Sequence, residues 1–131
     1  MKLMTRDTDY AVRSIAFIAG QKGKITSVTE LVGCLKIPYP FLRKILQILK
    51  RNNILKSYKG KGGGFLLGRP ANRIFLVDLI EIFQGPFRLN ECFLKKRICL
   101  NVSSCALKRK IDKIEKYVIR QLKSITIGDL V

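Results

Sequence analysis

The sequence predicts a mainly α fold: a winged helix-turn-helix with a β-hairpin wing and a long C-terminal dimerisation helix. Three observations predict it. Two short helical patterns lie a few residues apart, a glycine-rich hairpin pattern follows them, and a long amphipathic pattern ends the chain. With 131 residues, 47% of them hydrophobic, the chain can bury one core. Residues 1–85 are expected to form the winged helix-turn-helix, 86–105 a cysteine-bearing loop, and 106–131 the dimerisation helix and tail, in one structural domain overall.

The first expected helix begins at Asp7 or Thr8, since either side chain can cap a first turn. Gly20 ends its pattern of apolar residues at helical spacing. These residues are Ala11, Val12, Ile15, Ala16, Ile18 and Ala19.

A helix-turn-helix candidate follows. Ser27 and Glu30 have the spacing of a capping box and start a short helix, in which Cys34 is expected to be a small core residue. Pro40 suits the first turn of the next helix, which ends at residues 52–53. Its expected buried stripe is Phe41, Leu42, Ile45, Leu46, Ile48 and Leu49.

The stretch ILKSYKGKGGGFLLG, residues 54–68, predicts a strand, a glycine-rich turn and a return strand. Its glycines allow positive φ and close backbone approach. A phosphate-binding loop is excluded, because no glycine-lysine-serine/threonine sequence opens a helix here. A hairpin directly after a helix-turn-helix is a wing.

The rest of the chain predicts a short strand at residues 73–75, a short helix over 77–83 and a loop over 87–105. Ser103 or Ser104 then caps the long last helix. Its apolar residues nearly follow a heptad, which favours a second copy of the helix as partner over packing within one chain. They are Leu107, Ile111, Ile114, Val118, Leu122 and Ile125.

The charge of the chain indicates a polyanionic partner. The net charge is +17, from 26 basic and 9 acidic residues, and residues 31–77 contain ten cations and no acid. A merely solvated surface would intersperse both signs, so nucleic acid is favoured.

No apolar run could span a membrane, and charges interrupt residues 1–20, so a cytoplasmic location without a signal peptide is expected.

Three cysteines, Cys92, Cys99 and Cys105, lie within fourteen residues. In a reducing compartment such a cluster more often binds metal than forms disulfides. Three thiolates with one oxygen ligand suit an iron–sulfur cluster. Zinc fits the spacing less well, and a metal-free thiol switch is a further alternative.

The opening MKLMTRDTDYAVRS, the wing GKGGGFLLG, the three cysteines and the ending SITIGDLV resemble the Rrf family of winged-helix regulators that includes IscR and NsrR. The resemblance implies a homodimer and an iron–sulfur cluster, 2Fe-2S or 4Fe-4S, that tunes DNA binding. The three cysteines match the family's cluster ligands, although six residues separate Cys92 from Cys99 where those two members have five.

The resemblance also bears on the fourth cluster ligand. One branch of the family uses a histidine where this chain has Lys108, and the chain contains no histidine. The nitric-oxide-sensing branch takes an aspartate from the other subunit, and Asp9 matches it. Asp7 and Glu91 remain possible.

The third helix is expected in a DNA major groove, with the wing over the flanking backbone or minor groove. Arg43 is the strongest candidate for a guanine edge. Base contacts are expected from Pro38, Tyr39, Pro40, Arg43, Lys44 and Gln47, and backbone or minor-groove contacts from Arg51, Lys56, Lys59, Gly60 and Lys61.

The predicted function is a sequence-specific DNA-binding transcription regulator controlled by its cluster. Its partners are double-stranded DNA and a second copy, with no membrane and no small-molecule substrate. An enzyme is not expected, because the chain has no histidine, nucleophile motif or cofactor loop. An RNA-binding protein is the alternative from another class. It would expose aromatic residues, whereas Tyr10, Phe17, Phe41, Phe65 and Phe75 suit core or strand positions.

Overall fold

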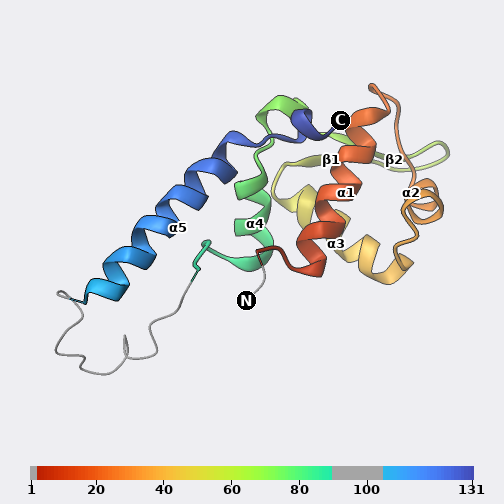
Figure 1. Cartoon of the computed structure of the whole chain (residues 1–131). Helices are drawn as coiled ribbons and strands as arrows, with labels where there is room; N and C mark the ends of the chain where they lie inside the picture. The colour runs from red at the N-terminus through yellow and green to blue at the C-terminus, as the bar shows by residue number, and fades with distance from the viewer. Residues whose placement is uncertain (1–2, 90–104) are drawn as a thin grey trace.

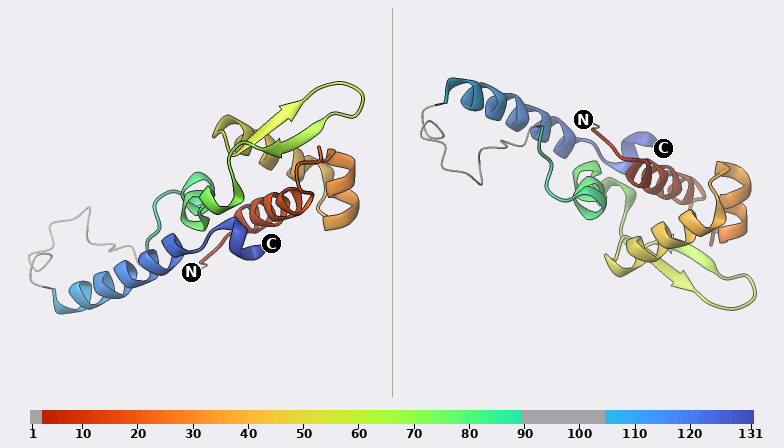
Figure 2. Two further views of the ribbon diagram at one scale, coloured as in Figure 1. Left: turned by 90° about the horizontal axis from the view of Figure 1, so that it is seen from above. Right: turned by 90° about the horizontal axis from the view of Figure 1, so that it is seen from below.

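A computed structural model describes residues 3–89 and 105–131 (Figure 1). A head of four helices and one hairpin carries a long helix that projects from it, and the hairpin lies at the end opposite that helix (Figure 2). This is the predicted mainly helical winged fold. In order, the elements are α1 (Arg6–Gly20), α2 (Val28–Leu35), α3 (Tyr39–Arg51), β1 (Leu55–Tyr58), β2 (Gly64–Leu67), η1 (Ala71–Arg73), α4 (Leu76–Gln84), α5 (Ala106–Ser124) and η3 (Ile127–Leu130).

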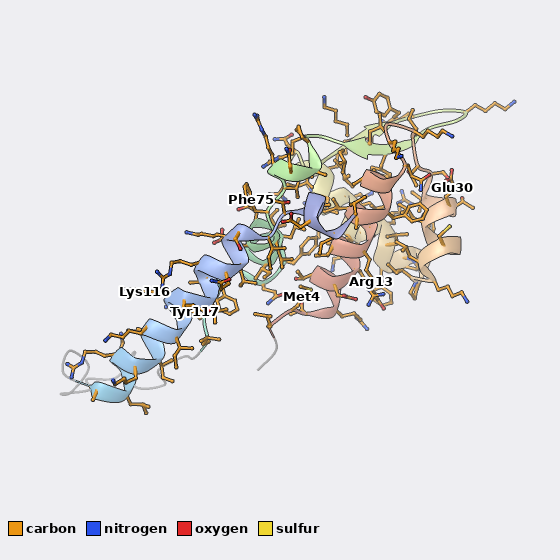
Figure 3. The ribbon with its side chains drawn as sticks, turned by 45° about the horizontal axis from the view of Figure 1, so that its top comes forward. Met4, Arg13, Glu30, Phe75, Lys116 and Tyr117 are labelled. Carbon is orange, nitrogen blue, oxygen red and sulfur yellow. The ribbon has the colours of Figure 1, made fainter. Side chains whose placement is uncertain are left out.

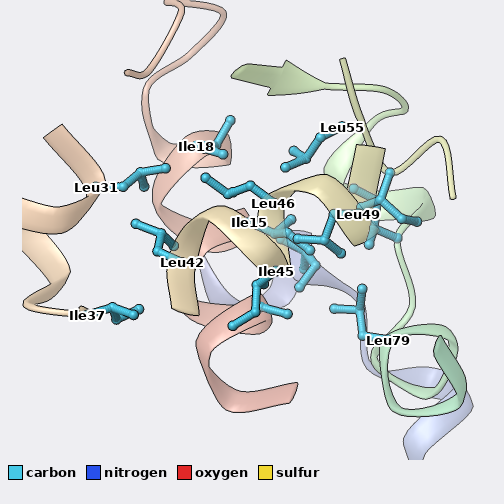
Figure 4. Packing of buried hydrophobic residues seen from close by; sticks show 14 residues of the cluster. Ile15, Ile18, Leu31, Ile37, Leu42, Ile45, Leu46, Leu49, Leu55 and Leu79 are labelled. Carbon is cyan, nitrogen blue, oxygen red and sulfur yellow. The ribbon is translucent and has the colours of Figure 1, made fainter. Parts of the chain in front are cut away.

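The core forms where α1 and α3 pack together (Figure 4). Ile15 of α1 and Leu46 of α3 are completely buried. Deleting such side chains leaves a cavity, so each stabilises the fold by about 2–5 kcal/mol. Residues from α2, β1 and α4 complete the same cluster, among them Leu31, Leu55 and Leu79.

The wing is held to the head by an isolated bridge between Thr26 and Phe65. β1 and β2 pair antiparallel from Leu55 opposite Leu67 to Tyr58 opposite Gly64. Thr26, which lies between α1 and α2, exchanges two backbone hydrogen bonds with Phe65, at 3.0 and 2.8 Å. A Cβ on Gly64 would lie 2.2 Å from the Thr26 carbonyl oxygen, so this close approach requires glycine.

The C-terminal tail returns to the head after α5. Thr126 pairs with Phe75 in an isolated bridge, and Ile127 donates a hydrogen bond to the Ile74 carbonyl at 2.9 Å. Ile127 is completely buried in the main core. The strand predicted at residues 73–75 is therefore wrong: η1 occupies its start, and a single bridge remains.

α5 packs on the head only near its C-terminal end. Leu122 is 5% exposed and lies against Leu76 and Ile80 of α4, whereas Leu107 is 69% and Ile114 52% exposed. The predicted apolar seam is thus divided between contact with α4 and a solvent-facing part. In the described part of the chain, no helix combines the length and hydrophobicity needed to cross a membrane.

Two helix starts differ from the prediction. Thr5, in extended conformation, caps α1 by accepting a hydrogen bond from the Thr8 amide, while Thr8 itself is buried. Cys105, one residue beyond the predicted serines, caps α5: its thiol accepts a hydrogen bond from the Lys108 amide at 3.5 Å. The predicted Ser27 cap of α2 is confirmed, with the Glu30 amide at 3.1 Å.

Candidate nucleic-acid interface

One face of α3 is polar, basic and exposed. The four residues of the opposite face, Leu42, Ile45, Leu46 and Leu49, are buried in the core. Since successive residues turn by about 100° around a helix, four of the six residues expected to contact bases lie on a single stripe, together with Arg51, which is expected at the DNA backbone or minor groove. These exposed residues are Pro40, Arg43, Lys44, Gln47 and Arg51.

A tight turn sets α3 against α2. Lys36 ends α2 in the left-handed conformation with φ 54°, and its amide donates to the Val32 carbonyl at 2.9 Å. Ile37 follows and is buried in the core, which fixes the chain before α3 begins at Tyr39. The geometry is that of a helix-turn-helix. Cys34, expected in the core, is instead exposed on α2.

The wing carries a second group of cations. Lys56 on β1 and Lys59, Gly60 and Lys61 at the tip are exposed. Gly60 and Gly62 have φ of 93° and 76°, which lets the tip turn tightly. None of the ten cations of residues 31–77 forms an ion pair with another residue that the structure describes.

Phe41 lies beside the polar stripe rather than in the core. It is 43% exposed, and the Arg6 guanidinium lies over its ring, 4.8 Å from the ring centre. Tyr39 is also exposed, at the start of α3. The prediction that Phe41 belongs to the buried stripe is therefore wrong. The helical pattern gives no signal for its contact with Arg6. Phe41 and Ile48 are seven residues apart, which is about two helical turns. Helical spacing alone therefore places both residues at the same edge of the buried stripe.

Of the candidate cluster ligands, the structure describes Cys105 and Asp9. Cys105 is free and half-buried at the start of α5, whereas Cys92 and Cys99 lie outside the described residues. Asp9, in the first turn of α1, forms an ion pair with Arg13 at 2.8 Å, with 41% and 63% of the side chains exposed. Among residues 3–89 and 105–131, no three histidine, cysteine or acidic side chains come together as a metal site.

The first turns of α1 and α5 lie well apart within one chain (Figures 1 and 2). Asp9 and Cys105 therefore do not meet in the monomer. Asp7, the other described alternative, shares the first turn of α1 with Asp9. Glu91 is outside the described residues.

The exposed face of α3, the wing and the unpaired cations together define a winged helix-turn-helix DNA-binding regulator. The model of the Rrf2 family, described as iron-dependent transcriptional regulators, matches residues 4–131. The chain belongs to the Rrf2 family, so DNA-binding transcription regulation, not enzymatic catalysis, is its class of function.

Relatives and solved structures agree with this assignment. Protein aau3 of Rhizobium meliloti is 34% identical over 129 residues, covering 98% of this chain and 84% of that protein. An HTH-type regulator of Aquifex aeolicus is 29% identical over 124 residues, covering 93% of this chain and 86% of that protein.

Two solved structures show the same fold. CymR, the global cysteine regulator of B. subtilis, has a TM-score of 0.84 and 23% identity, with 99% of this chain and 96% of that chain covered. IscR of T. potens has a TM-score of 0.77 and 21% identity, with 99% and 85% covered.

Proposed function

We propose that this regulator binds operator DNA as a homodimer in the cytoplasm, with α3 of each subunit in a major groove and the wing along the adjacent backbone. The observation that carries the proposal is the single stripe on α3, backed by a buried face, together with the exposed cations of the wing that follows α3 in the chain. Neutralising phosphates releases counterions, which gives a basic surface without acids its affinity for DNA. Base contacts from the stripe then add sequence preference.

Arg43→Ala is expected to relax the preference for one base pair of the operator and to cost about 1–3 kcal/mol there, because a bidentate guanine contact is lost. Lys59→Ala is expected to weaken all duplexes similarly and to flatten the salt dependence, because a phosphate contact is lost. Binding titrations against operator variants at several salt concentrations measure both effects. A uniform loss of affinity in both variants would contradict the assignment of α3 as the reader.

We further propose that an iron–sulfur cluster, held by Cys92, Cys99, Cys105 and Asp9 of the partner subunit, controls the operator affinity. The donor set supports it, since thiolates hold such clusters and a carboxylate at one iron leaves a labile, reactive site. Cys105 is free, half-buried and placed where the dimerisation helix begins. The Asp9 pair with Arg13 is an exposed ion pair worth about 0–1 kcal/mol, so releasing this carboxylate costs little.

Cys105→Ser is expected to abolish the visible absorption of the cluster in anaerobically purified protein. Its operator affinity should equal that of wild-type protein from which the cluster has been removed. Cys34→Ser is the matched control, because it removes an exposed thiol on α2 and should leave iron content and DNA binding unchanged. Metal analysis that finds zinc without iron in the wild type would overturn the cluster and favour the zinc alternative.

A thiol switch without metal remains the second candidate, favoured by the same free Cys105. It predicts operator binding that responds to oxidant in iron-free protein. RNA binding is tested separately, because Phe41, which the sequence assigned to the core, is 43% exposed. Competition between operator duplex and structured RNA decides between these nucleic acids.

A further inference from the structure

Gln84, the last residue of α4, is bonded to the start of α1. Its side-chain oxygen accepts from the Thr5 amide at 2.9 Å and from the Thr8 hydroxyl at 2.6 Å, and its side-chain nitrogen donates to the Leu3 carbonyl at 3.4 Å. The Thr5 amide can only donate, so the Gln84 atom that faces it must be the oxygen. The orientation of the Gln84 amide is thereby fixed.

The hydroxyl groups around Gln84 form a directed chain. The single proton of the Thr8 hydroxyl goes to Gln84, so the contact of 3.1 Å between the two threonine hydroxyls has Thr5 as its donor. Thr8 is completely buried, and no water can replace a lost partner without a structural change. The first turn of α1 therefore has one preferred position relative to the end of α4.

Arg6, the first residue of α1, contacts α3, the helix proposed to read DNA. Arg6 follows Thr5 directly, and its guanidinium lies over Phe41 in the first turn of α3. Phe41 is beside Pro40 and within one turn of Arg43 and Lys44 on the exposed stripe. Hydrogen bonds and a ring contact thus join the end of α4, through the first turn of α1, to the reading end of α3.

We propose that Gln84 and Arg6 are positioning residues for DNA recognition: Gln84 holds the first turn of α1, and Arg6 holds the flank of α3 through Phe41. Gln84 itself lies on α4, outside the α3 stripe and the wing. Because Gln84 is the last residue of α4, this link would carry a change at the end of α4 to α3, a role in regulation that rests on the proposed function.

The experiment compares full-length variants by operator affinity, affinity for unrelated duplex and thermal stability. Gln84→Leu is expected to weaken operator binding about three- to tenfold while unrelated duplex, bound through phosphates alone, changes less than twofold. Gln84→Glu keeps the acceptor oxygen for Thr5 and Thr8, loses only the long donor bond to the Leu3 carbonyl, and should retain most of the operator affinity. Ser14→Ala is the control: it removes another buried hydroxyl of α1, bonded to the Tyr10 carbonyl at 2.7 Å, without touching the link.

A double-mutant cycle separates positioning from general stability. If the link acts as a chain, Gln84→Leu adds little in a protein that already carries Phe41→Leu. Independent effects of these two substitutions, or equal losses for operator and unrelated duplex, would overturn the proposal. If no variant or wild-type protein prefers any duplex, the proposed function fails instead, which is a distinguishable result.

Discussion

Gly64→Ala is expected to lower the free energy of unfolding by about 3 kcal/mol, because the new methyl group collides with backbone that cannot move aside. Its Cβ would lie 2.2 Å from the carbonyl oxygen of Thr26 and 2.6 Å from the carbonyl carbon. The bridge between Thr26 and Phe65 must then open, and the wing loses its attachment to the head. Urea denaturation followed by circular dichroism measures the change.

Gly33→Ala is the matched control for this substitution. Gly33 lies inside α2, and a Cβ there has no neighbour within 4 Å. Alanine is the better helix former, so this variant should be up to about 1 kcal/mol more stable than the wild type. Similar losses of stability in the two variants would show that the close approach at Gly64 is not the cause. Operator affinity should fall in Gly64→Ala alone.

Ile114→Glu is expected to convert the proposed dimer into a monomer and to weaken operator binding by about a hundredfold or more, since the two half-sites are then bound independently. Ile114 is 52% exposed on α5, and Leu107, one heptad before it on the predicted seam, is 69% exposed. Tyr117, beside this seam, is also exposed. Figure 3 shows α5 with its side chains extending beyond the head. Sedimentation velocity at micromolar protein measures the association state.

Lys113→Ala provides the control, because it removes one positive charge from the neighbouring residue while Ile114→Glu adds one negative charge. Lys113 is exposed and, by helical spacing, lies outside the predicted heptad stripe of Leu107, Ile111, Ile114 and Val118. Its removal should leave the dimer intact and change DNA affinity little. A monomeric wild-type protein, or dissociation of both variants, would contradict the role of α5.

The parts of the fold that follow from local pattern could be predicted from the sequence. The spacing of Leu42, Ile45 and Leu49 predicts α3 and its buried face, and the glycines predict the wing. Pairing between distant residues could not be predicted. Phe75 meets Thr126 across some fifty residues, and no local signal reports that contact.

The site was predicted less completely, for two physical reasons. Helical spacing identifies apolar residues but not the neighbour that each one meets, so Phe41 was assigned to the core although Arg6 covers it. The regular repeat on α5 likewise conceals that Leu122 faces α4 while Leu107 faces solvent. For the cluster, Cys92 and Cys99 lie outside the described residues, so their assignment as ligands remains a proposal.

The attachment of α5 at one end makes it a lever. Leu122 and Ile127 fix its last turn and the tail to the head, while its 19 residues extend about 28 Å from that pivot. A tilt of about 10° at the pivot would displace the far end by about 5 Å, comparable to one helical turn. In the proposed dimer, a small change of packing at α4 would therefore alter the distance between the two heads far more than it alters either head.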